Sequence, residues 1–224
     1  MTRATLLLLA ATLAGCAAAP PAMAPRAIDA ADWLARARPV ALESVADADL
    51  DDQRISQAYA LATELDAAVG WVRACDTYWN PETQRLVTED ASAGYTRGLF
   101  MLHDIGPAEA IVAVTCDFGA YQGSYALVHV AGPRAALLVG MQVSETGAPF
   151  GPPVPVYATP AFDAGAHSFT TLGVSRGLGD CGVRASYDVS GFGTATLVEA
   201  RGRACDDRPG DAPPPEDWPV VYPR

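Results

Sequence analysis

The sequence predicts an α+β protein in which helices near the N-terminus precede a mainly antiparallel β domain with two disulfides. Before Gly70, apolar residues recur at steps of three and four, which is the period of an amphipathic helix. Between Gly182 and Ser190, apolar and polar residues alternate strictly, which is the period of a half-buried strand. The two patterns occupy separate parts of the chain, and that order is typical of α+β proteins.

Residues 1–15 have the composition of a secretion signal rather than of a folded element. A short positive region and a compact apolar run end at Leu13-Ala14-Gly15-Cys16, which resembles the lipobox of bacterial lipoproteins. The resemblance implies that Cys16 is lipidated and begins the mature chain. Ala17 after that cysteine favours the outer membrane, by resemblance to enteric lipoproteins. We therefore predict a cell-envelope protein that faces the periplasm and is held to a membrane by its acyl anchor.

The remaining composition fits this location. Residues 16–28 form an Ala- and Pro-rich tether, and the roughly 200 mature residues are enough for one sizeable domain. The formal net charge is −11, and all basic residues are arginine. That charge argues against nucleic acid as a partner and against electrostatic attachment to anionic lipid.

Two helices are expected within residues 29–70. The first covers residues 29–37, and Asp29 is a suitable N-cap because its side chain can accept from the first free backbone amides. The second begins near Asp51 and ends at Gly70, where a C-cap glycine belongs. Its apolar stripe is expected to pack on the sheet.

Residues 71–224 are expected to form the β-rich domain, with one antiparallel sheet of six to eight strands. The predicted strands cover residues 71–75, 99–102, 110–115, 121–130, 135–143, 183–189 and 194–201. Residues 103–107 and 144–160 are predicted to be loops because proline and glycine are frequent there.

Four cysteines remain after Cys16, an even number that points to two disulfides in an oxidising compartment. Four cysteines allow three connectivities. A hairpin that turns at Phe192 brings Cys181 opposite Cys205, and this leaves Cys75 for Cys116. A metal site is the alternative, but no C-x-x-C spacing occurs and no histidine lies near a cysteine. We predict no metal ligands.

Two catalytic patterns overlap the glycine-rich loop before that hairpin. Residues 177–182 spell the dinucleotide-binding G-x-G-x-x-G pattern, but a strand follows instead of the helix whose N-terminus would hold pyrophosphate. Residues 173–177 spell the G-x-S-x-G nucleophile elbow, which also requires a helix directly afterwards. We therefore predict no cofactor and no catalytic residues of these classes.

The C-terminal half resembles an exported bacterial family, the domain of unknown function 1176. The matching landmarks are Cys116 with 119–121 (GAY) and 124–127 (SYAL), 162–163 (FD), 176–182 (RGLGDCG), and Cys205 with 217–220 (DWPV). The likeness covers about residues 99–222, whereas the helical segment has no counterpart in the family and members are typically longer. The resemblance implies export and a β-rich, disulfide-bearing domain, and it brings no activity.

These observations together predict a non-enzymatic binding module. Its partner would be an envelope protein, a glycan or an enzyme to be inhibited. Tyr121, Tyr125, Arg176 and Asp180 are the candidate binding surface, because they lie near predicted loops or strand ends. The alternative is an envelope hydrolase that cleaves peptidoglycan or polysaccharide through a carboxylate pair, although no spacing singles out such a pair.

Overall fold

The computed structural model describes residues 27–43, 52–79, 97–118, 122–163, 166–206 and 212–223. The predicted signal peptide, the lipidation site Cys16, most of the tether and Tyr121 lie outside the described residues.

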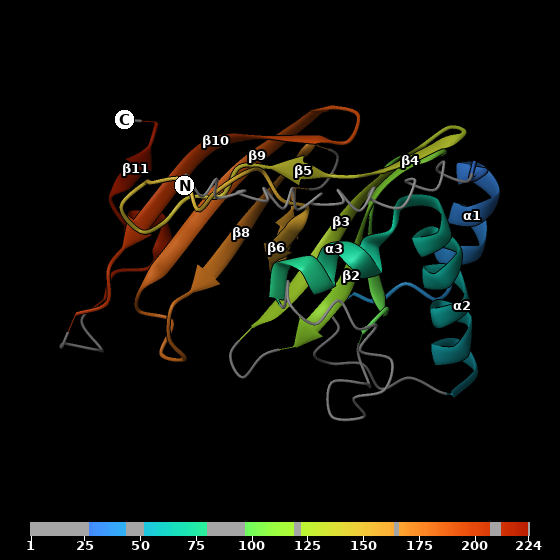
Figure 1. Ribbon diagram of the computed structural model, residues 1–224, viewed down its shortest axis with the longest axis horizontal. Coiled ribbons are helices and arrows are strands. Elements are labelled where there is room, and N and C mark those ends of the chain that lie inside the picture. Colours follow the sequence, from blue (N-terminus) through green and yellow to red (C-terminus); the bar gives the residue numbers. More distant parts are fainter. Residues whose placement is uncertain are drawn as a thin grey trace, which may run out of the picture.

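The first sheet has five strands and lies in the middle of the molecule, coloured green to orange-yellow in Figure 1. Its order is β1 (Phe100–Gly106), β2 (Glu109–Phe118), β3 (Gly123–Ala131) and β4 (Arg134–Leu137), and β6 (Val156–Ala158) also pairs with β3. All of these pairings are antiparallel. The near-continuous apolar sequence of β2 and β3 is typical of strands that are buried on both faces.

The second sheet has six strands and forms the orange and red part of the molecule (Figure 1). Its order is β11 (Val220–Tyr222), β10 (Thr194–Arg203), β9 (Gly182–Gly191), β8 (Ser168–Val174) and β7 (Pro160–Phe162), and β5 (Val139–Gly140) pairs in parallel with β10. The other pairings are antiparallel. The mainly antiparallel β architecture is thus confirmed, but the prediction of a single sheet is wrong.

The chain passes between the two sheets at Leu138, inside the predicted strand 135–143. The Leu138 amide donates to the Leu127 carbonyl at 2.7 Å, and the next amide, of Val139, donates to the Gly193 carbonyl at 3.1 Å. One continuous apolar run therefore supplies β4 to the first sheet and β5 to the second. The spacing of apolar residues in a sequence does not show such a change of partner strand.

The hairpin of β9 and β10 turns through Phe192 and Gly193, as predicted, with Gly191 paired to Thr194. Gly193 has a φ of +72°, which the two-residue turn requires and glycine adopts without steric cost. The Phe192 ring lies 5.0 Å from the His129 ring of β3, and the Arg134 guanidinium lies 4.2 Å above it. The tip of this hairpin therefore packs on the first sheet.

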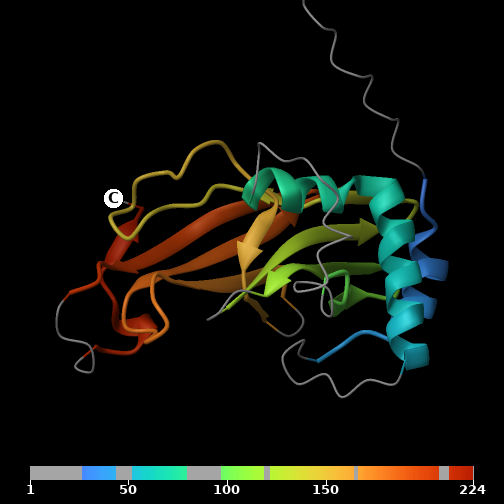
Figure 2. The same cartoon turned by 60° about the horizontal axis from the view of Figure 1, so that its bottom comes forward.

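Three helices lie at the side of the first sheet, and α1 and α2 form one end of the molecule (Figures 1 and 2). They are α1 (Ala30–Ala37), α2 (Asp52–Val69) and α3 (Trp71–Trp79). Asp29 caps α1 by accepting from the Asp32 amide at 3.2 Å. The indole of Trp33 donates to the Leu61 carbonyl at 3.2 Å and so joins α1 to α2.

Helix α3 corrects the predicted strand 71–75. Gly70, with a φ of +70°, ends α2, and the Asp66 carboxylate then accepts from the Val72 amide at 2.9 Å. Such a side-chain acceptor satisfies a free amide at a helix start. Trp71 and Cys75, one helical turn apart, are buried, whereas residues 72–74 and 76 of the same helix are partly or fully exposed. The pattern of apolar and polar residues over 71–75 is compatible with a helix or a strand. The hydrogen bond from the Val72 amide to Asp66 favours the helix.

Strand β1 also differs from its prediction, because it continues through Gly106 where a loop was expected over residues 103–107. His103 pairs with Ile111 and Asp104 with Ala110, so the ladder extends to a tight turn before Glu109. Pairing with the buried strand β2 outweighs the polar composition of these residues.

Both disulfides form between the cysteines that were predicted to pair. Cys75 of α3 is bonded to Cys116 of β2, and Cys181 is bonded to Cys205 at the open end of the β9–β10 hairpin. A partly buried ion pair, Arg97 to Asp76 at 2.6 Å, lies beside the first disulfide in sequence. These contacts tie the end of α3 to the sheet.

A single hydrophobic core contains residues from the helices and from both sheets. The helical segment 29–70 and the β-rich region are therefore packed together rather than separately. Of the helices in the described ranges, none combines the length and apolar character needed to span a bilayer.

Candidate ligand pocket between the two sheets

A pocket of about 350 Å³ opens where the ends of β2 and β3 meet β8 and β9. This volume is within the range of small-molecule sites, which begins at about 300 Å³. Polar side chains from four separate segments line it: Asp117, Gln122, Ser124, Gln142, Glu145, Thr171 and Ser175. Apolar and aromatic residues form the rest of the wall. Apolar walls with a few convergent polar groups are characteristic of ligand sites.

A β-bulge places Asp117 at the pocket. Thr115 pairs with Tyr125, and Asp117 pairs with the very next residue, Ser124, so Cys116 is the extra residue of β2. A bulge changes the direction in which the following side chains point. The extra residue is itself bonded to Cys75, so the disulfide holds the bulge in place.

Gln122 connects the two sheets at the pocket. Its side-chain oxygen accepts from the Val174 amide of β8 at 2.8 Å, although Gln122 directly precedes β3 of the first sheet. The hydrogen bond occupies the amide oxygen of Gln122. This contact fixes the distance between the two strand ends that frame the pocket.

Two tyrosines from different sheets form the floor of the pocket. Tyr157 of β6 donates to the Leu138 carbonyl at 3.1 Å, and Tyr187 of β9 donates to the Met141 carbonyl at 3.1 Å. Their rings meet edge to face at 5.4 Å between centroids, and Phe169 stacks on Tyr187 at 4.9 Å. Burial raises the pKa of Tyr157 far above its usual value, and the neighbouring Tyr187 adds to the shift. Tyr157 is therefore neutral and structural rather than an acid or base.

The segment 141–155, which we call the pocket loop, covers the second sheet beside the pocket (Figure 2). Two glycines allow its close approach. A Cβ atom at Gly202 would overlap the Glu145 carbonyl oxygen, and one at Gly147 would overlap the Val221 carbonyl oxygen. At the loop's outer part, Phe150 lines the pocket with 70% of its surface exposed. The loop thus combines a fixed backbone with an exposed aromatic rim.

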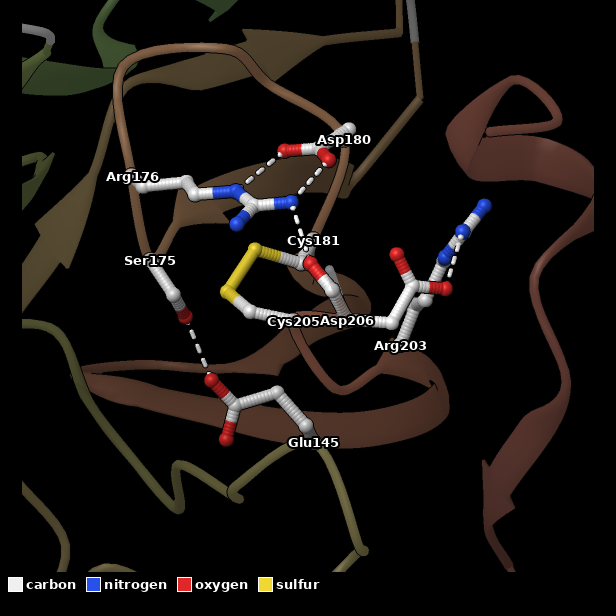
Figure 3. The surroundings of a disulfide bond; sticks show 8 residues. All are labelled: Glu145, Ser175, Arg176, Asp180, Cys181, Arg203, Cys205 and Asp206. Carbon is white, nitrogen blue, oxygen red and sulfur yellow. Dashed lines mark hydrogen bonds and ion pairs between the residues drawn. A yellow bond between two sulfur atoms is a disulfide. The ribbon is translucent and has the colours of Figure 1, made fainter. Parts of the chain in front are cut away.

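Glu145 of the pocket loop and Ser175 at the end of β8 point toward each other, as Figure 3 shows, and the serine hydroxyl donates to the carboxylate Oε1. The Ser175 amide donates to the Cys181 carbonyl at 3.1 Å. The pocket loop is therefore linked through Ser175 to the disulfide-bonded end of β9. Ser175 is the residue at the centre of the apparent nucleophile elbow, and here its partner is a carboxylate rather than a histidine.

The structure separates Tyr125 from Arg176 and Asp180, two other residues of the predicted binding surface. Tyr125 lies on β3 of the first sheet, is only 2% exposed and is hydrogen-bonded to Thr159. Burial raises the pKa of Tyr125, and the hydrogen bond partly offsets the shift. Tyr125 therefore packs in the core and forms no part of an exposed surface, which corrects its predicted role.

Arg176 and Asp180 lie on the loop between β8 and β9 and bind each other (Figure 3). Arg176 also donates to the Asp206 carbonyl at 3.0 Å, next to the disulfide at Cys205. The hydrogen bonds from Arg176 hold the pKa of Asp180 below its usual value. Through these contacts the pair holds the glycine-rich loop close to the end of β10. Neither residue lines the pocket.

The sequence singled out Gly173 and Ser175 only as parts of a rejected catalytic pattern, and it gave no indication of the other pocket residues. They come from strand ends and loops that are far apart in the chain, and no motif joins them. The available signal was Asp117 directly after a disulfide cysteine, yet a β-bulge has no sequence pattern strong enough to show where its side chain points.

Among the described residues, no group of three or more His, Cys, Asp and Glu side chains is arranged to hold a metal ion. No protein-family model matches the chain, and searches of curated proteins and of solved structures found no match. The resemblance to the domain of unknown function 1176 stays a prediction.

Proposed function

We propose that the protein is a lipid-anchored component of the bacterial cell envelope that binds a small ligand, free or attached to a larger envelope partner, without transforming it. The observation that carries this proposal is the preformed pocket between the sheets, with its aromatic wall and convergent polar groups. Two disulfides and a shared core support it, since a rigid scaffold loses little entropy when it binds.

The anchored location rests on the lipobox at Leu13 to Cys16, and the disulfides agree with an oxidising compartment. Metabolic labelling with a fatty-acid analogue tests it directly. We expect label on the wild-type chain and none on Cys16→Ser. Labelling that persists in Cys16→Ser contradicts the anchor.

Photocrosslinking in intact cells tests the binding role. A photoreactive residue at Phe150, on the rim of the pocket, should capture a ligand or a ligand-bearing partner, whereas one at Val198, 55% exposed on β10 and outside the pocket lining, should not. Identical products from the two positions contradict the proposal.

A pocket-filling variant makes this test specific. Gly173 lines the pocket, and a Cβ added there meets only Ala158 and Val183 atoms at 3.8 and 3.9 Å, so Gly173→Leu should fold and obstruct the cavity. Gly106→Leu is the matched control, because its added Cβ meets one atom, at 3.9 Å. The Phe150 product should disappear in the first variant and persist in the second.

A hydrolase remains the second candidate because Asp117 and Glu145, two carboxylates from different segments, both line the pocket. Paired carboxylates cleave glycosidic bonds as acid with base or as acid with nucleophile. Assay of peptidoglycan and of envelope polysaccharide with the wild type, Asp117→Asn and Glu145→Gln distinguishes the two functions. Cleavage that both variants abolish would replace the binding proposal with this one.

A further inference from the structure

Two glutamines line the pocket, and a backbone partner fixes which end of each side-chain amide stays unused. The side-chain oxygen of Gln122 accepts from the Val174 amide, so its N–H groups are left, and these donate to no described residue. Gln142 donates through Nε2 to the Val156 carbonyl, so its side-chain oxygen is left, and this oxygen accepts from no described residue. The lining therefore offers both hydrogen-bond donors and a hydrogen-bond acceptor.

The carboxylates of the lining already have contacts within the protein. Glu145 accepts from the Ser175 hydroxyl (Figure 3), and Asp117 interacts with another part of the protein. Anionic ligands are usually held by arginine, lysine or histidine, and none of these is among the described lining residues. The unused amide groups of the two glutamines are neutral, and they favour an uncharged polar ligand.

Phe150 supplies the exposed aromatic surface of the site. It lines the rim of the pocket with 70% of its surface exposed, whereas Tyr157 and Tyr187 are almost completely buried. An aromatic ring has a negative face, which attracts weakly positive C–H groups, and it also covers hydrocarbon. A ligand that packs on Phe150 is therefore expected to have a C–H face, with polar groups along its edge.

The strand edge at the pocket is not open to a peptide. Peptides commonly bind to sheets by adding a strand, which requires free backbone groups along an edge. At the end of β8, the Val174 amide is bonded to Gln122, and the Ser175 amide is bonded to the Cys181 carbonyl. Side chains rather than a strand edge are therefore available to recognise the ligand.

A sugar ring combines these features, because each hydroxyl group both donates and accepts and one face of the ring carries C–H groups. We propose that the ligand of this pocket is a neutral sugar, packed on Phe150 and bonded through its hydroxyl groups to the amides of Gln122 and Gln142. The inference rests on the proposed function and names the ligand class of the same site. A free sugar and a sugar unit of an envelope polysaccharide share this chemistry, and the experiment separates them.

Saturation-transfer NMR titrations of the full-length chain test the inference. The chain is kept in a polyoxyethylene detergent, because the sugar headgroup of an alkyl glycoside would compete for the site. Glucose, galactose and N-acetylglucosamine are compared with tetrahydropyran, whose ring has no hydroxyl groups. We expect at least one sugar to bind at least about tenfold more tightly than tetrahydropyran.

The linear trisaccharide of the sugar that binds distinguishes the two sources. A trisaccharide that binds at least about tenfold more tightly than the single sugar identifies a polysaccharide as the source. Equal affinities identify a free sugar. Both results agree with the inference.

Matched variants locate the binding. Gln122→Glu keeps an oxygen for the Val174 amide but loses the N–H donors, so the affinity for the sugar should fall at least about fivefold. Gln57→Glu, which adds the same charge at an exposed position of α2, should leave the affinity unchanged. Phe150→Ala should weaken binding at least about threefold, whereas Leu178→Ala, at another exposed apolar residue outside the pocket lining, should not. Circular dichroism of all four variants checks that they fold.

The other outcomes overturn the inference in distinguishable ways. Tighter binding of glucosamine than of glucose, or of N-acetylalanine methylamide than of any sugar, rejects the neutral sugar in favour of an amine or a peptide. Equal weakening by Gln57→Glu, or no weakening by Gln122→Glu, shows that the sugar binds elsewhere and rejects the inference. Failure of all sugars to bind also rejects it, and the proposed function falls as well only if Phe150 captures nothing in cells.

Discussion

The two sheets differ in how completely they are covered. In the first sheet, β3 is buried at eight successive positions, from Gly123 to Val130, so both of its faces are covered. In the second sheet, β10 alternates between exposed and buried residues along its first five positions, so one face is open to solvent. Helices pack against the first sheet, whereas an irregular loop beside the pocket covers part of the second.

This difference explains where the pocket lies. Regular elements with apolar faces pack densely and leave few voids. The pocket loop, residues 141–155, has four prolines and two glycines, and its polar side chains reach the boundary of the two sheets. The cavity is found at this boundary, where dense helix packing ends and loop packing begins.

Removal of a buried anchor between the helices should have the largest effect. Trp33 is fully buried and packs on Phe100 of β1 at 5.6 Å between ring centroids. Trp33→Ala should lower the free energy of unfolding by about 3 to 5 kcal/mol in urea denaturation. Val198→Ala, on the open face of the second sheet, should change it by less than about 0.5 kcal/mol. Comparable losses in the two variants would contradict the difference in coverage.

Removal of the disulfides compares the two sheets directly. The Cys75–Cys116 bond spans 41 residues, and the Cys181–Cys205 bond spans 24. In the chain-entropy treatment, replacing each pair by alanines costs about 4 and about 3.5 kcal/mol. Urea denaturation of the two double variants measures both. A larger loss at Cys181–Cys205 would show that α3 is held to the first sheet mainly by packing.

A substitution that adds a Cβ atom beneath the pocket loop should lower the free energy of unfolding by an intermediate amount. Gly202→Ala places that atom on the Glu145 carbonyl, so the loop must move away from β10. We expect a loss of about 1 to 3 kcal/mol from overpacking. Ligand affinity should fall in the same variant. Gly106→Ala, whose added Cβ has an ordinary contact at 3.9 Å, is the control. Unchanged stability and affinity in Gly202→Ala would show that the loop is not held as described.

We expect the smallest effect on stability at the ion pair of Arg176 and Asp180, which lies beside the second disulfide. The pKa of Asp180 is lowered when the protein folds, because Arg176 donates to its carboxylate. Its stabilising contribution is therefore complete above the ordinary aspartate pKa of about 3.9 and is lost as the pH falls toward the lowered folded value. Asp180→Asn should be less stable than the wild type at pH 7, and the difference should shrink below about pH 3.9. A constant difference in the urea midpoint at all pH values would contradict this linkage.

The sequence was most informative about the second sheet, because one face of this sheet is exposed to solvent. A strand with one open face shows an alternation, and β9 was located from Val183, Ala185, Tyr187 and Val189 together with the turn at Gly193. The cysteines then paired as the hairpin required. The apolar run over residues 135–143 shows no such alternation, so it did not reveal its passage from one sheet to the other.

The candidate site was not predictable from the sequence. Tyr125 was selected because it is aromatic and near a strand end, and Arg176 and Asp180 because they lie in a loop. Burial and mutual pairing assign them structural contacts instead. The pocket depends on a bulge, a change of sheet and a loop seated on two glycines, which are tertiary features.

Amide chemical-shift mapping of the isotope-labelled full-length chain during titration with the small-molecule fraction of a bacterial envelope extract tests the central claim most directly. The account predicts that the shifts concentrate at Gly123, Thr171 and Val174, which lie on both sheets around one pocket. Resonances of α1 should not move. Shifts that instead follow exposed carboxylates such as Asp32 and Asp104, with none at the pocket, would contradict it.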